Sequence, residues 1–254
     1  MSSRSQSIEK KEAAEKIIVA LDVAEEEDAC GLVKDLCPPL SFFKVGMRLY
    51  AACGPRIITK LKNLGVKVFL DLKFHDIPHT VASAVEIITS YGVDMFNIHL
   101  SGGSDMIRAA VEKTAEVAAK LGIPKPAMLG VTVLTSLPEK VLREELAVER
   151  SLEQHVLDLS LLGKKNGIDG VVASPREAGL IRQNCGKDFL IVSPGVRPGW
   201  STTNDQARVL TPRQALEGGA DYLVIGRPIT GHTNPGEAVE KILAEIVTVQ
   251  GISK

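Results

Sequence analysis

The sequence contains a buried-strand pattern that ends in charged residues, Val66-Lys-Val-Phe-Leu-Asp-Leu-Lys-Phe-His-Asp-Ile-Pro78. Its first five residues predict a strand, and Asp71, Lys73 and Asp76 follow within the next six positions. Residues two apart leave the same face of a strand, so Asp71 and Lys73 are expected to point the same way. Because two carboxylates and an ammonium are costly to desolvate beside an apolar core, the cluster is either a structural ion-pair network or a reactive site.

Outward from this stretch, apolar runs alternate with helical segments along the whole chain. The runs predict eight strands, at 16–23, 41–46, 66–70, 95–100, 127–134, 170–174, 189–193 and 221–226. Helices are expected over 24–36, 51–64, 81–91, 105–121, 139–165, 176–184, 212–218 and 237–249. Eight such pairs in about 240 residues predict an α/β protein with a single-domain (β/α)8 TIM barrel at 16–250, preceded by a polar tail at 1–15. A doubly wound open sheet would give the same local signals, but the first strand–helix turn lacks the dinucleotide glycine fingerprint.

Composition narrows the function classes. The 254 residues are 44% apolar, and 30 basic side chains against 31 acidic ones leave a net charge of −1. Because neither sign dominates, the balance argues against a general nucleic-acid binder or a protein of anionic membrane surfaces. The four cysteines show no zinc-type spacing, and we see neither a signal segment nor an apolar run of about 18 residues. We therefore expect a cytoplasmic protein with free thiols.

Charged residues gather where the predicted strands end. Asp22 closes the first strand, Lys44 lies on the second, and Asp71 and Lys73 end the third. In a (β/α)8 barrel these ends meet at one mouth, where catalytic residues lie. Alternating charges there would keep one another ionised, and a purely structural network would be a costly way to stabilise a barrel rim. A functional interpretation is therefore favoured.

Two later loops predict an anion site. Ser193-Pro-Gly-Val-Arg-Pro198 follows the seventh strand, and Gly226-Arg-Pro-Ile-Thr230 follows the eighth. Barrels commonly bind phosphate in these two loops. The glycines let backbone N–H groups approach an anion, and Arg197 or Arg227 can bind its oxygens. In the long connection that follows Pro198, Gln206 could either face water or pair with an amide-like ring edge.

A metal site is not favoured. His75, His79 and His99 lie near the carboxylates, but no HxH or HExxH spacing occurs. Lys44 and Lys73 would repel a divalent cation in the same pocket. We therefore do not expect a metal in this pocket.

Together these motifs resemble the orotidine 5′-phosphate decarboxylase family, from Ile17 to about Thr230. The DxKxxD element alone is shared with sugar-phosphate lyases of the same superfamily, but its combination with the other motifs is specific. The resemblance rests on Phe43-Lys-Val-Gly46, Asp71-Leu-Lys-Phe-His-Asp-Ile77, Thr132-Val-Leu-Thr-Ser136, Pro194-Gly-Val-Arg197 and Gly226-Arg-Pro228.

The resemblance implies cofactor-independent decarboxylation of orotidine 5′-monophosphate to UMP and CO₂, the last step of de novo UMP synthesis. Lys73 corresponds to the proton donor to C6, and Asp71 holds Lys73 protonated beside the substrate carboxylate. Asp22 and Lys44 would bind ribose hydroxyls, while Lys44 also belongs to the catalytic array. The remaining contacts to the base and phosphate would come from Thr135, Pro194, Arg197, Gln206, Gly226 and Arg227.

The resemblance also implies a homodimer with shared active sites. Asp76, Ile77 and Thr80 would reach the partner's pocket, where Asp76 completes the catalytic array. One alternative is a keto-sugar-phosphate decarboxylase or hexulose-phosphate synthase, which needs a divalent metal and a carboxylate in place of Lys44. A second is a catalytically inactive nucleotide-binding module, which would need no proton donor such as Lys73.

Overall fold

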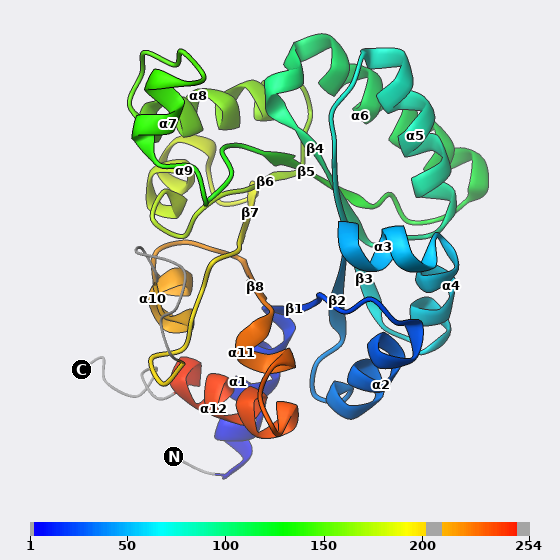
Figure 1. Cartoon of the computed structure of the whole chain (residues 1–254), viewed down its shortest axis with the longest axis vertical. Coiled ribbons are helices and arrows are strands. Elements are labelled where there is room, and N and C mark those ends of the chain that lie inside the picture. Colours follow the sequence, from blue (N-terminus) through cyan, green and yellow to red (C-terminus); the bar gives the residue numbers. More distant parts are fainter. Residues whose placement is uncertain (1–2, 202–209, 248–254) are drawn as a thin grey trace.

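The computed structural model describes residues 3–201 and 210–247, and it contains a closed barrel of eight parallel strands in sequence order (Figure 1). The barrel closes where the first and last strands pair, with Ile17 opposite Leu223. The predicted single-domain (β/α)8 fold is thus confirmed. The strands are β1 (Ile17–Leu21), β2 (Phe42–Gly46), β3 (Lys67–Phe74), β4 (Met95–His99), β5 (Ala127–Val131), β6 (Gly170–Val172), β7 (Leu190–Ser193) and β8 (Tyr222–Ile225).

Helices surround this ring of strands (Figure 1). They are α1 (Ser3–Glu15), α2 (Glu26–Leu36), α3 (Met47–Cys53), α4 (Arg56–Asn63), α5 (Pro78–Ser90), α6 (Gly103–Leu121), α7 (Glu139–Glu144), α8 (Leu152–Lys165), α9 (Ala178–Cys185), α10 (Pro212–Glu217), α11 (Arg227–Thr230) and α12 (Pro235–Val247), with a 3₁₀ turn η1 (Leu100–Gly102). None of the helices in the described part of the chain is long and apolar enough to cross a membrane.

Several element boundaries differ from the prediction. The helix expected over 51–64 is two helices, because Gly54 has φ +64° and Pro55 follows it. The helical segment expected over 139–165 is likewise divided into α7 and α8. Strand β3 is longer than predicted and runs to Phe74, so Asp71 and Lys73 lie within the strand rather than beyond it.

The barrel interior explains why the charges gather at one end. Alternate strand residues face inward and pack together as Ile18, Ala20, Phe42, Phe69, Met95, Leu129, Val192 and Val224. Two residues further along their strands, the same inward positions hold Lys44, Asp71 and Asn97. The barrel interior is therefore apolar in the layers towards the amino ends of the strands and polar in the layer at their carboxyl ends.

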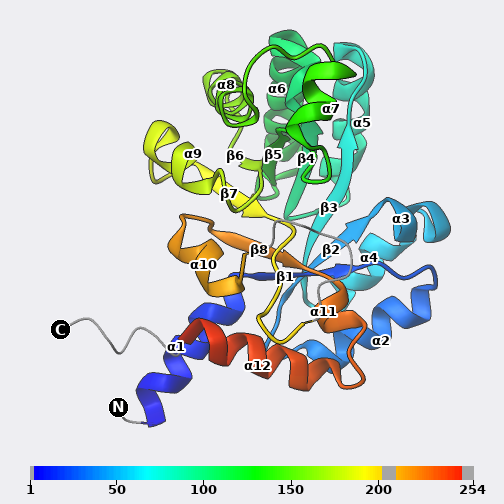
Figure 2. The same cartoon turned by 60° about the vertical axis from the view of Figure 1, so that its left-hand side comes forward.

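The first and last helices lie side by side outside the barrel (Figures 1 and 2). Residues 3–15, within the segment predicted as a polar tail, form α1, and its Ala13 and Ala14 are buried. Lys10 Nζ lies 2.7 Å from Glu240 Oε2 on α12. Helix α1 is therefore packed on the last helix of the barrel.

Candidate active site

Four predicted residues meet in one alternating chain of charges at the barrel mouth. Lys73 Nζ donates a 2.6 Å hydrogen bond to Asp71 Oδ1. Lys44 Nζ lies 3.3 Å from Asp71 Oδ2 and 3.6 Å from Asp22 Oδ1. The order Asp22, Lys44, Asp71, Lys73 therefore alternates carboxylate and ammonium.

Asp71 is the centre of this chain, with its side chain only 13% exposed. Burial opposes its ionisation, but the charges of Lys44 and Lys73 and hydrogen bonds from Lys73 and Asn97 outweigh burial and lower the pKa of Asp71. The carboxylate is thus ionised at neutral pH and accepts hydrogen bonds only. It keeps a positive charge at Lys73 favourable in a half-buried position.

Strand β3 is irregular where it carries these residues. Its Leu70 and Phe74 lie opposite Phe96 and Ile98 of β4, so β3 has two more residues than β4 across this interval. Lys73, within the bulge, has φ +54°, which side chains of L-residues disfavour. The side chains of Asp71 and Lys73 meet, but the strand pairing between them is irregular, so regular alternation does not account for the contact.

Two glycines leave the room that the charged groups need. A Cβ atom on Gly46 would lie 2.9 Å from Lys44 Nζ, and one on Gly226 would lie 3.3 Å from Asp22 Oδ2. Gly226 directly follows β8, so the loop predicted to bind phosphate borders Asp22. The missing side chains allow Lys44 and Asp22 to approach each other at the mouth.

The loops predicted to bind an anion are placed on this same side of the barrel. Gly226 precedes α11, so the segment expected to be a loop is partly a short helix that begins at Arg227. Gly195 has φ +76°, and the Arg197 N–H donates a 3.1 Å hydrogen bond to Leu210 O. Gln206, predicted to contact the base, lies outside the described residues.

The structure does not bring Asp76 into the charge chain. Asp76 is exposed, and its Oδ1 accepts a hydrogen bond of 2.7 Å from the N–H of Ile77. Thr80, in the first turn of α5, is also exposed. Both residues lie on the loop and helix that follow β3.

A family model described as "Orotidine 5'-phosphate decarboxylase / HUMPS family" matches residues 15–242. The chain belongs to this family. A relative from Syntrophomonas wolfei named orotidine 5'-phosphate decarboxylase is 51% identical over 92% of this chain and 99% of its own length. A relative of the same name from Nostoc sp. is 47% identical, over 92% of this chain and 98% of its own. The crystal structure of orotidine 5'-phosphate decarboxylase from Lactobacillus acidophilus matches with a TM-score of 0.80 and 38% identity, covering 91% of this chain and 99% of that one.

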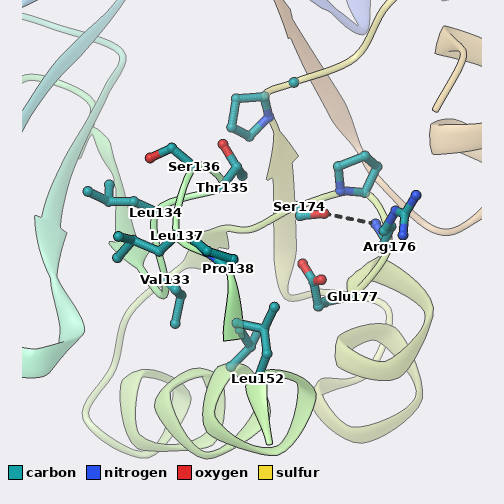
Figure 3. A pocket seen from close by; sticks show the side chains of 14 residues that line it. Val133, Leu134, Thr135, Ser136, Leu137, Pro138, Leu152, Ser174, Arg176 and Glu177 are labelled. Carbon is teal, nitrogen blue, oxygen red and sulfur yellow. Dashed lines mark hydrogen bonds between the residues drawn. The ribbon is translucent and has the colours of Figure 1, made fainter. Parts of the chain in front are cut away.

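In this member of the orotidine 5'-phosphate decarboxylase / HUMPS family, a cavity of about 290 Å³ adjoins the mouth (Figure 3). Thr135 and Ser136 lie on one side and Ser174 and Glu177 on the other, above the apolar Leu152 (Figure 3). Burial raises the pKa of Glu177, although a hydrogen bond from Ser174 opposes this. Thr135 and Pro194, both predicted to bind substrate, line this cavity with Val133, Leu134, Leu137, Pro138, Val156, Pro175, Arg176 and Gly195.

Two histidines lie beside the charge chain of this family member. The rings of His75 and His99 are 5.2 Å apart between centroids. Burial, followed by the nearby His75 and the charge of Lys73, lowers the pKa of His99, although Asp71 opposes the shift. His99 is therefore neutral at physiological pH and adds no further positive charge to the site.

Sequence reasoning missed Asn97, the polar residue that joins Asp71 to Lys73. Its amide contacts both residues and is fully buried on β4. The strand alternation indicates its position, because Asn97 follows the inward-facing Met95 by two residues and so also faces the barrel interior. Its amide is neutral, so it gives no charge signal of the kind that marks Asp71 and Lys73.

Proposed function

We propose that this chain decarboxylates orotidine 5′-monophosphate to UMP and CO₂ without a metal or another cofactor. The observation that carries the proposal is the ammonium of Lys73, fixed 2.6 Å from the carboxylate of Asp71 at the barrel mouth. The decarboxylase names of relatives 47% and 51% identical support the same activity. Lys44, where the metal-dependent alternative needs a carboxylate, supports it further.

The proposed reaction breaks the bond between C6 of the pyrimidine and its carboxylate. The electron pair of this bond remains on C6, CO₂ departs, and Lys73 Nζ delivers a proton to C6 to complete UMP. The neutral amine then regains a proton from solvent. Negative charge grows at C6 along this path, so a fixed ammonium stabilises the transition state more than the ground state.

Asp71 would serve the reaction in two ways. Its negative charge lies beside the ammonium from which C6 would receive its proton, and its hydrogen bond aims Lys73 Nζ. Its carboxylate would also lie beside that of the substrate, whose departure removes a like-charge repulsion. Asp22 and Lys44, at the other end of the chain of charges, would bind the ribose hydroxyls.

The rest of the nucleotide would lie towards the later strands. Arg197, Gly226 and Arg227 would bind the phosphate, and Thr135, Pro194 and Gln206 would contact the base or the loop above it. Because the phosphate is remote from the broken bond, its binding energy can hold the substrate in position for the chemical step.

We further propose a homodimer in which Asp76, Ile77 and Thr80 complete the partner's site. Ile77 is 66% exposed beside Asp76, so both side chains are accessible to a partner subunit. Mixing inactive Lys73→Ala and Asp76→Asn chains tests this. Shared sites predict recovery of about a quarter of wild-type activity after subunit exchange at equal amounts, because half the dimers are mixed and each has one intact site. No recovery despite demonstrated exchange would place Asp76 in its own subunit's site.

The activity is tested by the loss of absorbance of orotidine 5′-monophosphate in buffer containing EDTA. We expect turnover by the wild-type chain and none measurable by Lys73→Ala, which removes the proton donor. Wild-type inactivity, or near-normal turnover by Lys73→Ala, would contradict the proposal. Turnover of a keto-sugar phosphate that EDTA abolishes would favour the metal-dependent alternative.

Cytoplasmic location and the absence of a nucleic-acid partner stay predictions from composition.

A further inference from the structure

We propose that Asn97 is a positioning residue that holds Asp71 and Lys73 in their reactive arrangement. The inference rests on the proposed decarboxylation, because it concerns the same two side chains. Asn97 lies on β4, next to the irregular part of β3. Its role would be to act through its neighbours without touching the substrate.

One amide group binds both catalytic residues. Asn97 Nδ2 donates a 2.7 Å hydrogen bond to Asp71 Oδ1, and Asn97 Oδ1 accepts a 2.8 Å hydrogen bond from the backbone N–H of Lys73. The residue is 0% exposed, so water does not replace these partners. Asparagine carries a donor and an acceptor on one short rigid group, which suits it to both bonds.

The backbone of Lys73 needs such a partner. A bulge leaves extra residues without their usual partners on the neighbouring strand, and the N–H of Lys73 lies in the bulge of β3. Lys73 also has φ +54°, a conformation that persists in L-residues when the surroundings enforce it. The bond to Asn97 Oδ1 satisfies the N–H and favours the backbone conformation from which the Lys73 side chain starts.

The carboxylate of Asp71 gains its orientation from the same amide. Oδ1 accepts hydrogen bonds from Lys73 Nζ at 2.6 Å and Asn97 Nδ2 at 2.7 Å, while Oδ2 lies 3.3 Å from Lys44 Nζ. Rotation of the carboxylate would break the bond to Asn97. The amide therefore assigns one oxygen to each lysine, which fixes where the ammonium of Lys73 is held.

The test compares Asn97→Leu, which removes both bonds at similar size, with Asn97→Asp, which keeps the acceptor for Lys73 N–H. The matched control is Asn166, whose buried amide bonds to Ser104, Arg108 and Leu162 at the end of α8. Asn166→Leu and Asn166→Asp measure how much the loss of a buried amide outside the charge chain changes activity and thermal stability. Each variant is assayed for kcat and KM with orotidine 5′-monophosphate and for thermal stability.

We expect both Asn97 variants to lose about 10- to 100-fold in kcat with little change in KM, because displacement of a catalytic group mainly affects the chemical step. For Asn97→Asp the loss should shrink as the pH is lowered, relative to wild type at each pH. The introduced carboxyl faces Asp71, which raises its pKa, and once protonated it can donate to Asp71 Oδ1 as the amide does. Asn97→Leu should show no such recovery, and the Asn166 variants should keep wild-type kcat.

Several results would overturn the inference. They are a kcat within twofold of wild type in either Asn97 variant, a rise in KM alone, an equal loss in the Asn166 variants, or a loss in Asn97→Asp that does not change with pH. If Asn97→Leu does not fold, the pH series of Asn97→Asp decides. An inactive wild-type chain would instead overturn the proposed function and this inference with it.

Discussion

Replacing Gly46 by alanine should damage activity far more than stability. The added Cβ would lie 2.9 Å from Lys44 Nζ, and real Cβ atoms essentially never make contacts under 3.0 Å. Gly46 itself has φ −94° and ψ −179°, so alanine fits the backbone without strain. The clash therefore falls on the end of the flexible Lys44 side chain, which has to move by about 0.5 Å to reach an ordinary contact distance.

The expected loss of stability in Gly46→Ala is small, whereas the expected loss of activity is large. At an effective dielectric constant of about 20, lengthening the 3.3 Å pair of Lys44 and Asp71 by about 0.5 Å weakens it by roughly 0.7 kcal/mol. Alanine in place of glycine at the start of α3 adds a cost below about 1 kcal/mol. A catalytic array is less tolerant, since a misplacement of about 1 Å can lower the rate about 100-fold. We expect kcat/KM to fall by at least about tenfold.

The assay combines decarboxylation kinetics with urea unfolding. Gly31→Ala on α2 is the matched control, because a Cβ there meets nothing within 4 Å. It should keep full activity and wild-type stability or slightly better. Wild-type kcat/KM in Gly46→Ala would refute the reasoning about space around Lys44. So would a loss of activity that merely follows the unfolded fraction.

Three further predictions concern single side chains. Lys73→Gly should be more stable than Lys73→Ala by about 1 kcal/mol in urea unfolding, because φ +54° disfavours alanine but not glycine. Asp71 has a lowered pKa, so its ionised form stabilises the fold above about pH 4, the pKa region of an unfolded aspartate, and that stability is lost as the pH falls further. Unfolding experiments should therefore show that Asp71→Asn loses less stability between pH 5 and pH 3 than the wild-type chain does. Burial raises the pKa of Glu177, so a carboxyl there favours the folded state at low pH and loses that advantage as the pH rises. Glu177→Gln should therefore raise Tm relative to wild type more at pH 8 than at pH 4.

A different outcome would contradict each of the predictions for Lys73, Asp71 and Glu177. Ala147 also has a positive φ, +54°, and Ala147→Gly provides a control for the backbone effect outside the site. Equal stability of the two Lys73 variants would mean that the backbone relaxes on substitution. Parallel acid unfolding curves would contradict the ionised state of Asp71, and a Tm difference independent of pH would contradict the effect of burial on Glu177.

The eight-fold repeat was predictable because parallel strands are buried on both faces and appear as apolar runs. The ends of the individual helices and strands were less predictable. The division between α3 and α4 depends on Gly54 and Pro55, which the apolar periodicity of 51–64 does not reveal. The extra length of β3 comes from a bulge, and the sequence pattern of charged residues there resembles the end of a strand.

The charge chain of the site could also be predicted, since Asp22, Lys44 and Asp71 lie in or just after the carboxyl-terminal halves of strands that a barrel brings together. The geometry at Lys73 could not. Regular alternation describes side-chain direction only while the strand pairing is regular, and the register shifts between Leu70 and Phe74. Asn97 was missed because its importance comes from two contacts across the strands rather than from its charge.

The pairing of α1 with α12 has a practical consequence. Helix α1 leads into the start of β1, so its outer end lies away from the carboxyl ends of the strands (Figure 2). The outer end of α1 is thus remote from the face that carries Asp71 and Lys73 (Figure 2), whereas Glu245 near the end of α12 contacts Gly199 and Thr211 of the connection after β7. Peptide tags or surface attachments introduced before α1 should leave diffusion of a nucleotide to the mouth unhindered, so a preparation immobilised there should retain the kinetics of the free protein.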